Sequence, residues 1–248
     1  SSIYNENYIH YKNRSLVYSD LEKYDKAIDD LDQAIELHTT SGPDISYLLN
    51  LKGLMYEYQE IYDTALEYYN KSIESDSLYT TPYRNIADIY KVQSRYEDSY
   101  EMFGKAIEIS SRHESEEESL YYALRARLLQ DIEEYDMALE DISEAISKYD
   151  TSSDREDLRT YYFKRAYMYD VFFDDKFSLA IEDYLSSNAI REHYVALMNI
   201  GIIYQQDLEN YVVAMDYFDK SEEVFDEYSL LYRNRARTFV LMNDFENA

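Results

Sequence analysis

The sequence predicts an all-α fold built from repeated pairs of helices, and three observations support it. Among 248 residues there are only 4 Gly and 2 Pro, too few for the tight turns of a β-sandwich or barrel. A pattern of one small residue between large ones recurs seven times along the chain. Within each copy, apolar residues recur at intervals of three and four, which is typical of two amphipathic helices.

The small residues mark the first helix of each copy, and an Ala or Ser marks the second. The first set is Ser15, Gly53, Ala87, Ala126, Ala166, Gly201 and Ala236. The second set is Ala27, Ala65, Ser99, Ala138, Ala180, Ala214 and Ala248. We therefore predict one solenoid domain over residues 1–248 with about 6.5 repeats, at 8–41, 46–79, 80–113, 119–152, 159–193, 194–228 and 229–248. The last copy stops inside its second helix, so we expect the natural protein to continue past Ala248.

The spacing of the marks, 34 residues between Gly53 and Ala87, and segments such as "YDKAIDDLDQAIEL" (24–37) and "YDMALEDISEAI" (135–146) resemble the tetratricopeptide repeat family. The resemblance covers essentially the whole chain. It implies an antiparallel pair of helices, A and B, in every repeat. It also implies that the pairs stack into a right-handed superhelix with a concave groove lined by the A helices. The corresponding function is a non-enzymatic scaffold or adaptor for protein partners.

Extra residues separate some of the predicted helices. They fall at 38–46, 110–119 and 150–157 between repeats, and at 171–177 inside the fifth repeat. These segments contain residue types that favour helix N-caps and turns. We predict longer turns there or an added helical turn.

Basic residues interrupt several otherwise apolar A helices directly before the small residue. Where Arg holds this position and the partner position exists, helix B carries Asp at the matching turn, whereas Ile86 and Ile200 are matched by Met102 and Tyr217. This pattern predicts charged hydrogen bonds within about 3.5 Å. The predicted pairs are Arg14 with Asp30, Arg125 with Asp141, and Arg165 with Asp183; Arg235 holds the same position in the last copy.

Tyrosine is the most conspicuous residue type, with 31 copies. Fifteen of them occupy the 21 large positions of the repeat pattern, the last of which is Phe245. A ladder of aromatic rings could stack on bases or sugars, but helical spacing at these positions indicates packing between helices.

Charge and composition exclude several functions. The net charge of −27 disfavours binding to nucleic acid. No apolar run is long enough to insert into a membrane, and there is no Cys for disulfides, thiolate metal sites or nucleophilic catalysis. The four histidines, His10, His38, His113 and His193, have no ligand-like spacing. We expect no catalytic residues, no metal and no cofactor.

Residues 11–37 look like the co-chaperone repeats that clamp the C-terminal carboxylate of Hsp70 or Hsp90. In that clamp, Asn is required where this chain has Leu16, four residues after Lys12, and again where it has Leu51. Asn85, Asn199 and Asn234 match one clamp position singly. We therefore do not expect a carboxylate clamp of this type.

The groove is the predicted working surface. Its positions lie six and three residues before the small residue of helix A, and one, four and five residues after it. These positions sum to a charge of +1, which leaves −28 on the rest of the chain. The candidate partner-binding residues are Lys12, Tyr47, Leu54, Tyr58, Arg84, Lys91, Arg127, Phe163, Tyr167, Met198, Ile202, Arg233 and Arg237. The alternative is that some of them only pack between repeats.

Three functional hypotheses follow. The first is a protein-interaction scaffold that binds a peptide or helix in the groove. The second is a sensory or regulatory segment of a larger enzyme or of a transcriptional or signalling regulator. The third is a glycan- or lipoprotein-assembly factor outside the cytoplasm, suggested by the groove aromatics. A cytoplasmic location is slightly favoured, with export if a signal peptide precedes Ser1; the sequence assigns neither partner identity nor oligomeric state.

Overall fold

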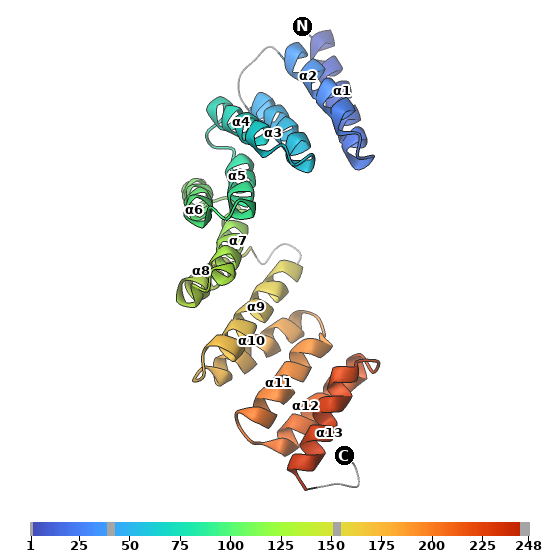
Figure 1. Ribbon diagram of the computed structural model, residues 1–248, viewed down its shortest axis with the longest axis vertical. Helices are drawn as coiled ribbons and strands as arrows, with labels where there is room; N and C mark the ends of the chain where they lie inside the picture. The colour runs from blue at the N-terminus through green and yellow to red at the C-terminus, as the bar shows by residue number, and fades with distance from the viewer. Residues whose placement is uncertain (1, 39–42, 151–154, 244–248) are drawn as a thin grey trace. The chain divides into compact units, whose positions relative to one another are not determined.

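The computed structural model describes residues 2–38, 43–150 and 155–243, and within these ranges it contains helices and no strand (Figure 1). Odd-numbered helices hold the small residues and are the A helices: α1 (Ser2–Asp20), α3 (Pro43–Tyr58), α5 (Thr81–Val92), α7 (Glu118–Asp131), α9 (Glu156–Phe172), α11 (Tyr194–Gln206) and α13 (Ser229–Leu241). Even-numbered helices are the B helices: α2 (Tyr24–Leu37), α4 (Tyr62–Ser75), α6 (Tyr96–Arg112), α8 (Tyr135–Ser147), α10 (Phe177–Ile190) and α12 (Tyr211–Val224). The predicted all-α class of antiparallel helix pairs is therefore correct.

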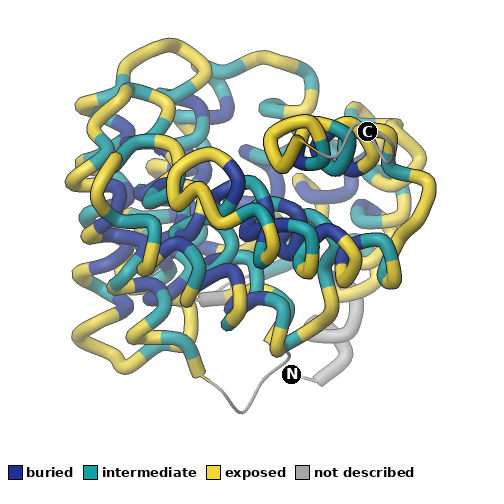
Figure 2. The backbone as a smooth tube through the Cα atoms, turned by 90° about the horizontal axis from the view of Figure 1, so that it is seen from below, coloured by how far each residue is buried: buried dark blue, intermediate teal, exposed yellow. Residues whose placement is uncertain are grey.

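The helices form two compact units, Ser1–Leu128 and Leu129–Ala248. In unit 1, α1 packs on α2, α3 on α4, and α5 on α6; in unit 2, α9 packs on α10 and α11 on α12 (Figure 1). Each of α2, α4, α10 and α12 also packs on the A helix that follows it. Figure 2 shows exposed residues gathered at the turns and buried residues recurring along the helices. Each unit therefore stacks hairpins whose neighbours complete their cores.

The chain leaves four of the A helices through the same backbone turn. At α3, the N–H of Glu60 donates to the carbonyl of Glu57 at 2.8 Å, and the N–H of Ile61 donates to the carbonyl of Tyr56 at 2.9 Å. Glu60 has a φ of 61°, in the left-handed region that usually favours Gly. The same turn recurs at Glu22, Ser94 and Glu133. It reverses the chain so that helix B begins two residues later, at a Tyr in each case.

In three hairpins, a small residue of helix A lies in close contact with a large residue of helix B. A Cβ added to Gly53 would lie 2.6 Å from the ring of Tyr69, and one added to Gly201 would lie 2.5 Å from the ring of Phe218. Both rings are fully buried. In α5 and α6, Ala87 and Phe103 share a core cluster in the same way. The small residue is thus the space into which the ring of helix B fits.

The aromatic positions pack around these cores as predicted. Partly buried rings surround the apolar clusters in both units, including those of Tyr11, Tyr18, Tyr24, Tyr56, Tyr62, Tyr90, Tyr169 and Tyr204. Tyr232 differs, because its side chain is exposed. The predicted position Phe245 and the marker Ala248 lie outside the described residues.

The extra residues are accommodated in more than one way. Helix α6 has 17 residues, three more than α2 or α4, so the third repeat gains most of a helical turn. In the fifth repeat α9 runs on to Phe172, whose ring stacks on that of Tyr135 with centroids 3.8 Å apart. The predicted insertions at 38–46 and 150–157 fall partly on residues 39–42 and 151–154, which lie outside the described part of the chain.

We predict opposite effects for two alanine substitutions at helical glycines. Gly53→Ala should lower the free energy of unfolding by about 1–3 kcal/mol, because its Cβ overlaps the buried ring of Tyr69. Gly104→Ala should raise it by about 0.5–1 kcal/mol, because the nearest atom is the end of the flexible Arg125 side chain at 3.7 Å. Urea denaturation of both variants measures the two effects; a shift of both midpoints in the same direction would contradict the close-contact explanation.

Candidate functional site

Two of the three predicted Arg–Asp contacts are present in the structure. Arg14 Nε and Nη2 donate to the two carboxylate oxygens of Asp30 at 2.7 and 2.6 Å, and Arg165 Nε and Nη2 donate to those of Asp183 at 2.6 and 2.9 Å. Asp30 and Asp183 are buried. Burial raises the pKa of Asp183, and the hydrogen bond from Arg165 opposes the rise. These arginines therefore join the two helices of one repeat. The third pair, Arg125 with Asp141, has one member in each unit and stays a prediction.

The same position of helix A also reaches the preceding repeat, which the sequence pattern did not reveal. Lys52, in the position of Arg14, is buried and donates to Asp32 of α2, while its ammonium lies 4.5 Å from the ring centre of Tyr68. Arg235 Nη1 donates a hydrogen bond to Glu222, and Arg235 Nη2 lies 3.0 Å from Asp219 Oδ1; both acids are on α12. Arg165 likewise donates to Ser143 of α8 at 3.2 Å. A basic residue here holds helix A against the B helices on both sides of it.

In unit 1, predicted groove positions contact the A helix that follows. The ammonium of Lys12 lies 5.8 Å from the ring centre of Tyr47. Between α3 and α5, the Asn85 side-chain amide donates to the Asn50 amide oxygen at 3.0 Å, and both residues are buried. Asn85 is thereby used for packing, and so is Asn199, which donates to the hydroxyl of Tyr184. The contacts of Lys12 and Asn50 define an A-helix face in unit 1. Asn85, and Asn199 of unit 2, both single clamp-like asparagines, have structural roles.

Exposed aromatic side chains remain on this face. Tyr47 is 37% exposed and Tyr58 is 51% exposed. The ring of Tyr58 packs against that of Tyr24 in a tilted arrangement, with the ring centroids 5.5 Å apart. Leu54, another predicted groove residue, is partly buried against the core cluster that contains Leu31 and Leu48. These two tyrosines are the large apolar side chains of α3 that stay exposed among the described residues.

A charged cluster lies on the A-helix face of unit 1. Burial raises the pKa of the Asp88 carboxyl, and the charges of the predicted basic residues Arg84, Lys91 and Arg127 oppose the rise. Burial also raises the pKa of Glu57, which accepts a hydrogen bond from the hydroxyl of Tyr69. Arg84 donates to the side-chain oxygen of Asn85, and Arg127 is exposed.

In unit 2, two predicted anchors form a pocket. Phe163 and Tyr167 of α9 line a cavity of about 280 Å³ together with Lys164 and Gln130. Tyr167 is 40% exposed. The ring of Phe163 makes edge-to-face contacts with two other rings: its centroid lies 5.4 Å from that of Tyr184 and 5.1 Å from that of His193. The pocket is therefore a recess on α9 whose aromatic ring Phe163 packs against the rings of Tyr184 and His193.

The remaining predicted residues of unit 2 differ in exposure. Met198 is 3% exposed and belongs to the core cluster that contains Phe218 and Leu231, and Ile202 packs against the same cluster. Met198 therefore presents no surface to a partner. Arg233 and Arg237 of α13 are exposed. The Gln205 side chain donates to the Asn234 carbonyl at 2.9 Å and so joins α11 to α13.

Tyrosine–carboxyl pairs connect the core to the A-helix faces. Tyr69 of α4 donates to Glu57, and Tyr184 of α10 donates to Asp170 at 3.3 Å. Both acids stand four residues after the small residue of their A helix. Tyr69 and Tyr184 stand four residues after the Ala of helix B. Among the described hairpins, helix A carries an acid four residues after its small residue only where this buried B-helix residue is Tyr. Comparison of repeats at these two positions is the signal that could have found the pairs.

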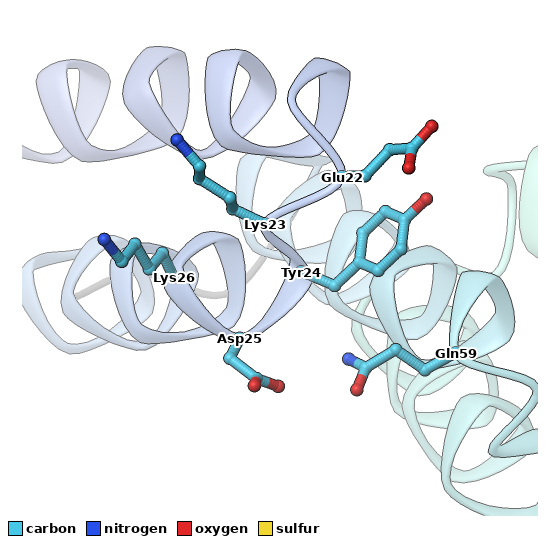
Figure 3. A pocket seen from close by; sticks show the side chains of 6 residues that line it. All are labelled: Glu22, Lys23, Tyr24, Asp25, Lys26 and Gln59. Atoms are coloured by element: carbon cyan, nitrogen blue, oxygen red, sulfur yellow. The ribbon is translucent and has the colours of Figure 1, made fainter.

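A second recess lies at the turn between α1 and α2 and has a volume of about 260 Å³. It is lined by Glu22, Lys23, Tyr24, Asp25, Lys26 and Gln59. Figure 3 shows Lys23 and Lys26 extending to one side, while Glu22, Tyr24 and Gln59 lie on the other. The two cations and two anions of this lining balance, so the recess favours neither sign of ligand.

Neither a metal-binding cluster nor a membrane-spanning helix is found among the described residues. No group of three or more His, Cys, Asp or Glu side chains in those ranges is arranged to hold a metal ion. None of the described helices combines the length and the apolar character that crossing a bilayer requires.

The fold places the molecule among helical-hairpin repeat proteins. Residues 7–77 match the family model of the tetratricopeptide repeat. The first two repeats of the chain therefore match the tetratricopeptide-repeat family, and likeness of fold to solved structures of such repeats covers most of the remainder.

Known proteins with similar repeats differ widely in what they do. The human protein O-mannosyl-transferase TMTC1 is 26% identical over 99 residues, which are 40% of this chain and 11% of that much longer protein. The structure of YrrB, described as a tetratricopeptide-repeat protein with an unusual peptide-binding site, has a TM-score of 0.60 at 19% identity, covering 82% of this chain and 96% of YrrB. The C-terminal part of a repeat protein from Cytophaga hutchinsonii has a TM-score of 0.72 at 14% identity, covering 94% and 92%. These likenesses to structures establish the fold alone.

We predict that Asp170 makes stability depend on pH. Burial raises its pKa from 3.8 to about 6, the hydrogen bond from Tyr184 lowers it, and Asp207 raises it. Because the folded chain binds this proton more tightly than the unfolded chain, the contribution of Asp170 to stability falls as pH rises from about 4 to about 7. Asp170→Asn keeps an acceptor for Tyr184 and should be more stable than the wild type at pH 7.5, with the gain shrinking steadily as pH falls toward 4.

Thermal unfolding at several pH values measures this difference. The control is Asp175→Asn, at an exposed position of the neighbouring turn, which should follow the wild-type curve. A constant difference between Asp170→Asn and wild type across the pH range would refute the assignment.

Proposed function

We propose that the chain is a non-catalytic protein-interaction scaffold that binds a partner peptide or helix on its A-helix faces. The observation that carries the proposal is the distribution of exposed large apolar side chains. Among the described residues, ten lie on A helices and four on B helices. The ten are Ile9, Val17, Tyr47, Tyr58, Val92, Tyr167, Val171, Tyr232, Val240 and Leu241.

The positions of these side chains support a binding role over ordinary surface scatter. Eight of the ten, all except Val17 and Tyr232, stand at the groove positions that the repeat pattern defines. Clustered apolar surface of this kind marks sites where a partner is bound. Burying each of these side chains in a complex would contribute about 1–3 kcal/mol. The aromatic pocket of Phe163 and Tyr167 would receive one anchoring side chain.

The fold adds general support. Tetratricopeptide repeats serve as protein-interaction scaffolds, and YrrB is described as having a peptide-binding site. The A-helix contacts of unit 1, such as Lys12 with Tyr47 and Asn50 with Asn85, would hold adjacent anchors at fixed spacing. A partner segment would then meet a largely preformed surface, which limits the entropy lost on binding.

The test compares two double variants of the intact chain. Tyr58→Ala with Tyr167→Ala should reduce recovery of bound proteins at least tenfold in affinity purification with quantitative mass spectrometry. Leu185→Ala with Val212→Ala removes exposed apolar side chains from B helices and should recover the same proteins as wild type. All four side chains are exposed, so each variant should fold, which circular dichroism checks. Equal recovery by both variants would sink the proposal.

We infer a second candidate function, a sensory or regulatory segment of a larger enzyme or of a transcriptional or signalling regulator. The similar stretch of TMTC1 is 11% of a longer transferase, which favours this alternative. The full reading frame distinguishes the two functions: an adjoining catalytic or DNA-binding sequence supports the second, and its absence supports the first.

A further inference from the structure

We propose that the recess of Phe163 and Tyr167 on α9 binds the side chain of a Lys or Arg that a partner segment carries. This inference rests on the proposed function and specifies one side chain of the partner. The cavity of about 280 Å³ lies below the usual range of about 300–1,000 Å³ for pockets that hold whole small molecules. It therefore suits a single side chain.

The first argument is that a carboxylate shares the helix face of the two rings. Phe163, Tyr167 and Asp170 are separated by four and three residues on α9, a spacing that places side chains on one face of a helix. The ring centroid of Phe163 lies 5.4 Å from that of Tyr184, whose hydroxyl donates to Asp170 at 3.3 Å. Tyr167 is 40% exposed and Asp170 is half-buried. A side chain that enters over the rings therefore comes near a carboxylate.

The second argument is how this chain binds its own cations. The guanidinium carbon of Arg95 lies 4.0 Å from the ring centre of Tyr90, and Arg95 Nε donates to Asp98 at 2.7 Å. The face of an aromatic ring attracts a cation, and a carboxylate beside the ring pairs with the same charge. The arrangement recurs at Arg14 with Tyr11 and Asp30, Lys52 with Tyr68 and Asp32, Lys71 with Tyr68 and Glu67, Arg165 with Tyr162 and Asp183, and Lys220 with Tyr217 and Asp216. A tyrosine ring beside a carboxylate is thus the recurring site for Lys or Arg in this molecule.

The third argument is that Tyr167 and Asp170 form this arrangement without a cation from the chain itself. The ring of Tyr167 contacts that of Phe172, with the centroids 6.3 Å apart. The carboxylate of Asp170 accepts a hydrogen bond from a hydroxyl, that of Tyr184. Of the described Lys and Arg residues, none lies over the Tyr167 ring or forms an ion pair with Asp170. A basic side chain of a partner would therefore meet the same chemistry that the chain offers its own cations.

Opposite charges border the cavity, and they give the proposal a sharp test. Lys164 also lines the cavity and would repel a bound cation. Asp170 would attract one, and Asp207 lies close enough to raise the pKa of Asp170, so a second negative charge acts at this site. Removing the charge of Lys164 or of Asp170 should therefore change the affinity for a basic side chain in opposite directions. For an acidic ligand both signs would be reversed.

The experiment selects ligands from a display library of random 12-residue peptides against the intact chain. Peptides that also bind the Tyr167→Ala variant are removed, because general attraction to a chain with a net charge of −27 affects both proteins alike. Tyr167 is 40% exposed, so this variant should fold, which circular dichroism checks. We expect the remaining peptides to contain a surplus of Lys and Arg.

The affinity of one enriched peptide that lacks His, Asp and Glu is then measured by fluorescence anisotropy with a fluorescein label. It should bind Asp170→Asn at least about tenfold more weakly than wild type, because a charged hydrogen bond is lost. Lys164→Gln should bind it about two- to fivefold more tightly, because a repulsion is removed. The matched control Asp175→Asn removes the same charge as Asp170→Asn at an exposed position of the neighbouring turn, and should bind it as wild type does.

A pH series provides a readout that a purely structural role of Asp170 would not give. Burial raises the pKa of Asp170 to about 6, so its carboxyl is ionised at pH 7.5 and largely protonated at pH 5. The peptide should therefore bind wild type more weakly at pH 5, whereas its affinity for Asp170→Asn should change much less. Because Asp170→Asn is expected to be more stable than wild type at pH 7.5, weaker binding by this variant cannot come from unfolding.

The outcomes separate this inference from the proposed function. Equal affinity of Asp170→Asn and wild type, or weaker binding by Lys164→Gln, would overturn the inference. Peptides that need Tyr167 but show no surplus of Lys and Arg would leave the scaffold proposal standing and refute the choice of side chain alone. If no peptide is enriched over Tyr167→Ala, the recess is not a binding site and the inference is wrong, while the affinity purification still decides the scaffold proposal.

Discussion

The fit of one large B-helix side chain against one small A-helix residue is the constraint on which the other features depend. At Gly53 and Gly201 there is no room for even a methyl group, because the rings of Tyr69 and Phe218 fill that space. The close approach brings the two backbones of a repeat near enough for one side chain to join its helices. Arg165, which bonds to Asp183 of the same repeat, is an example. The close approach also lets the Tyr69 and Tyr184 hydroxyls reach carboxyls of the A helix.

The sequence alone revealed the all-α class, the helix pairs and the role of most tyrosines, because each rests on a pattern that repeats many times. It revealed the Arg–Asp contacts of Arg14 and Arg165 because both partners vary together within one repeat. It did not reveal Lys52 with Asp32 or Arg235 with Asp219, since those partners belong to the preceding repeat. Comparing positions inside single repeats cannot detect contacts that connect neighbouring ones.

The candidate site was less predictable, because exposure depends on what the next helix covers. Met198 and Tyr167 both stand at groove positions, yet Met198 is enclosed with Leu231 of α13 while Tyr167 borders a pocket. The sequence also did not show that two acids near the groove positions have shifted pKa values. Counting formal charges treats Asp88 and Glu57 like any other acids, whereas burial changes how readily they ionise. How deeply a side chain is buried depends on how neighbouring repeats pack. It therefore cannot be predicted from the residue type at one position of the repeat.

The turns between A and B helices carry a consequence for how copies of this protein behave in solution. Backbone hydrogen bonds reverse the chain at these turns, so the side chain of the residue with positive φ is not needed to form the turn. This chain places Glu at three of the four matching turns, at Glu22, Glu60 and Glu133, where Gly would adopt the conformation with less strain. All three are exposed. At Glu60 and Glu133 this places exposed negative charge on the hairpin tip, so crowded molecules would repel one another there without any change to the interior.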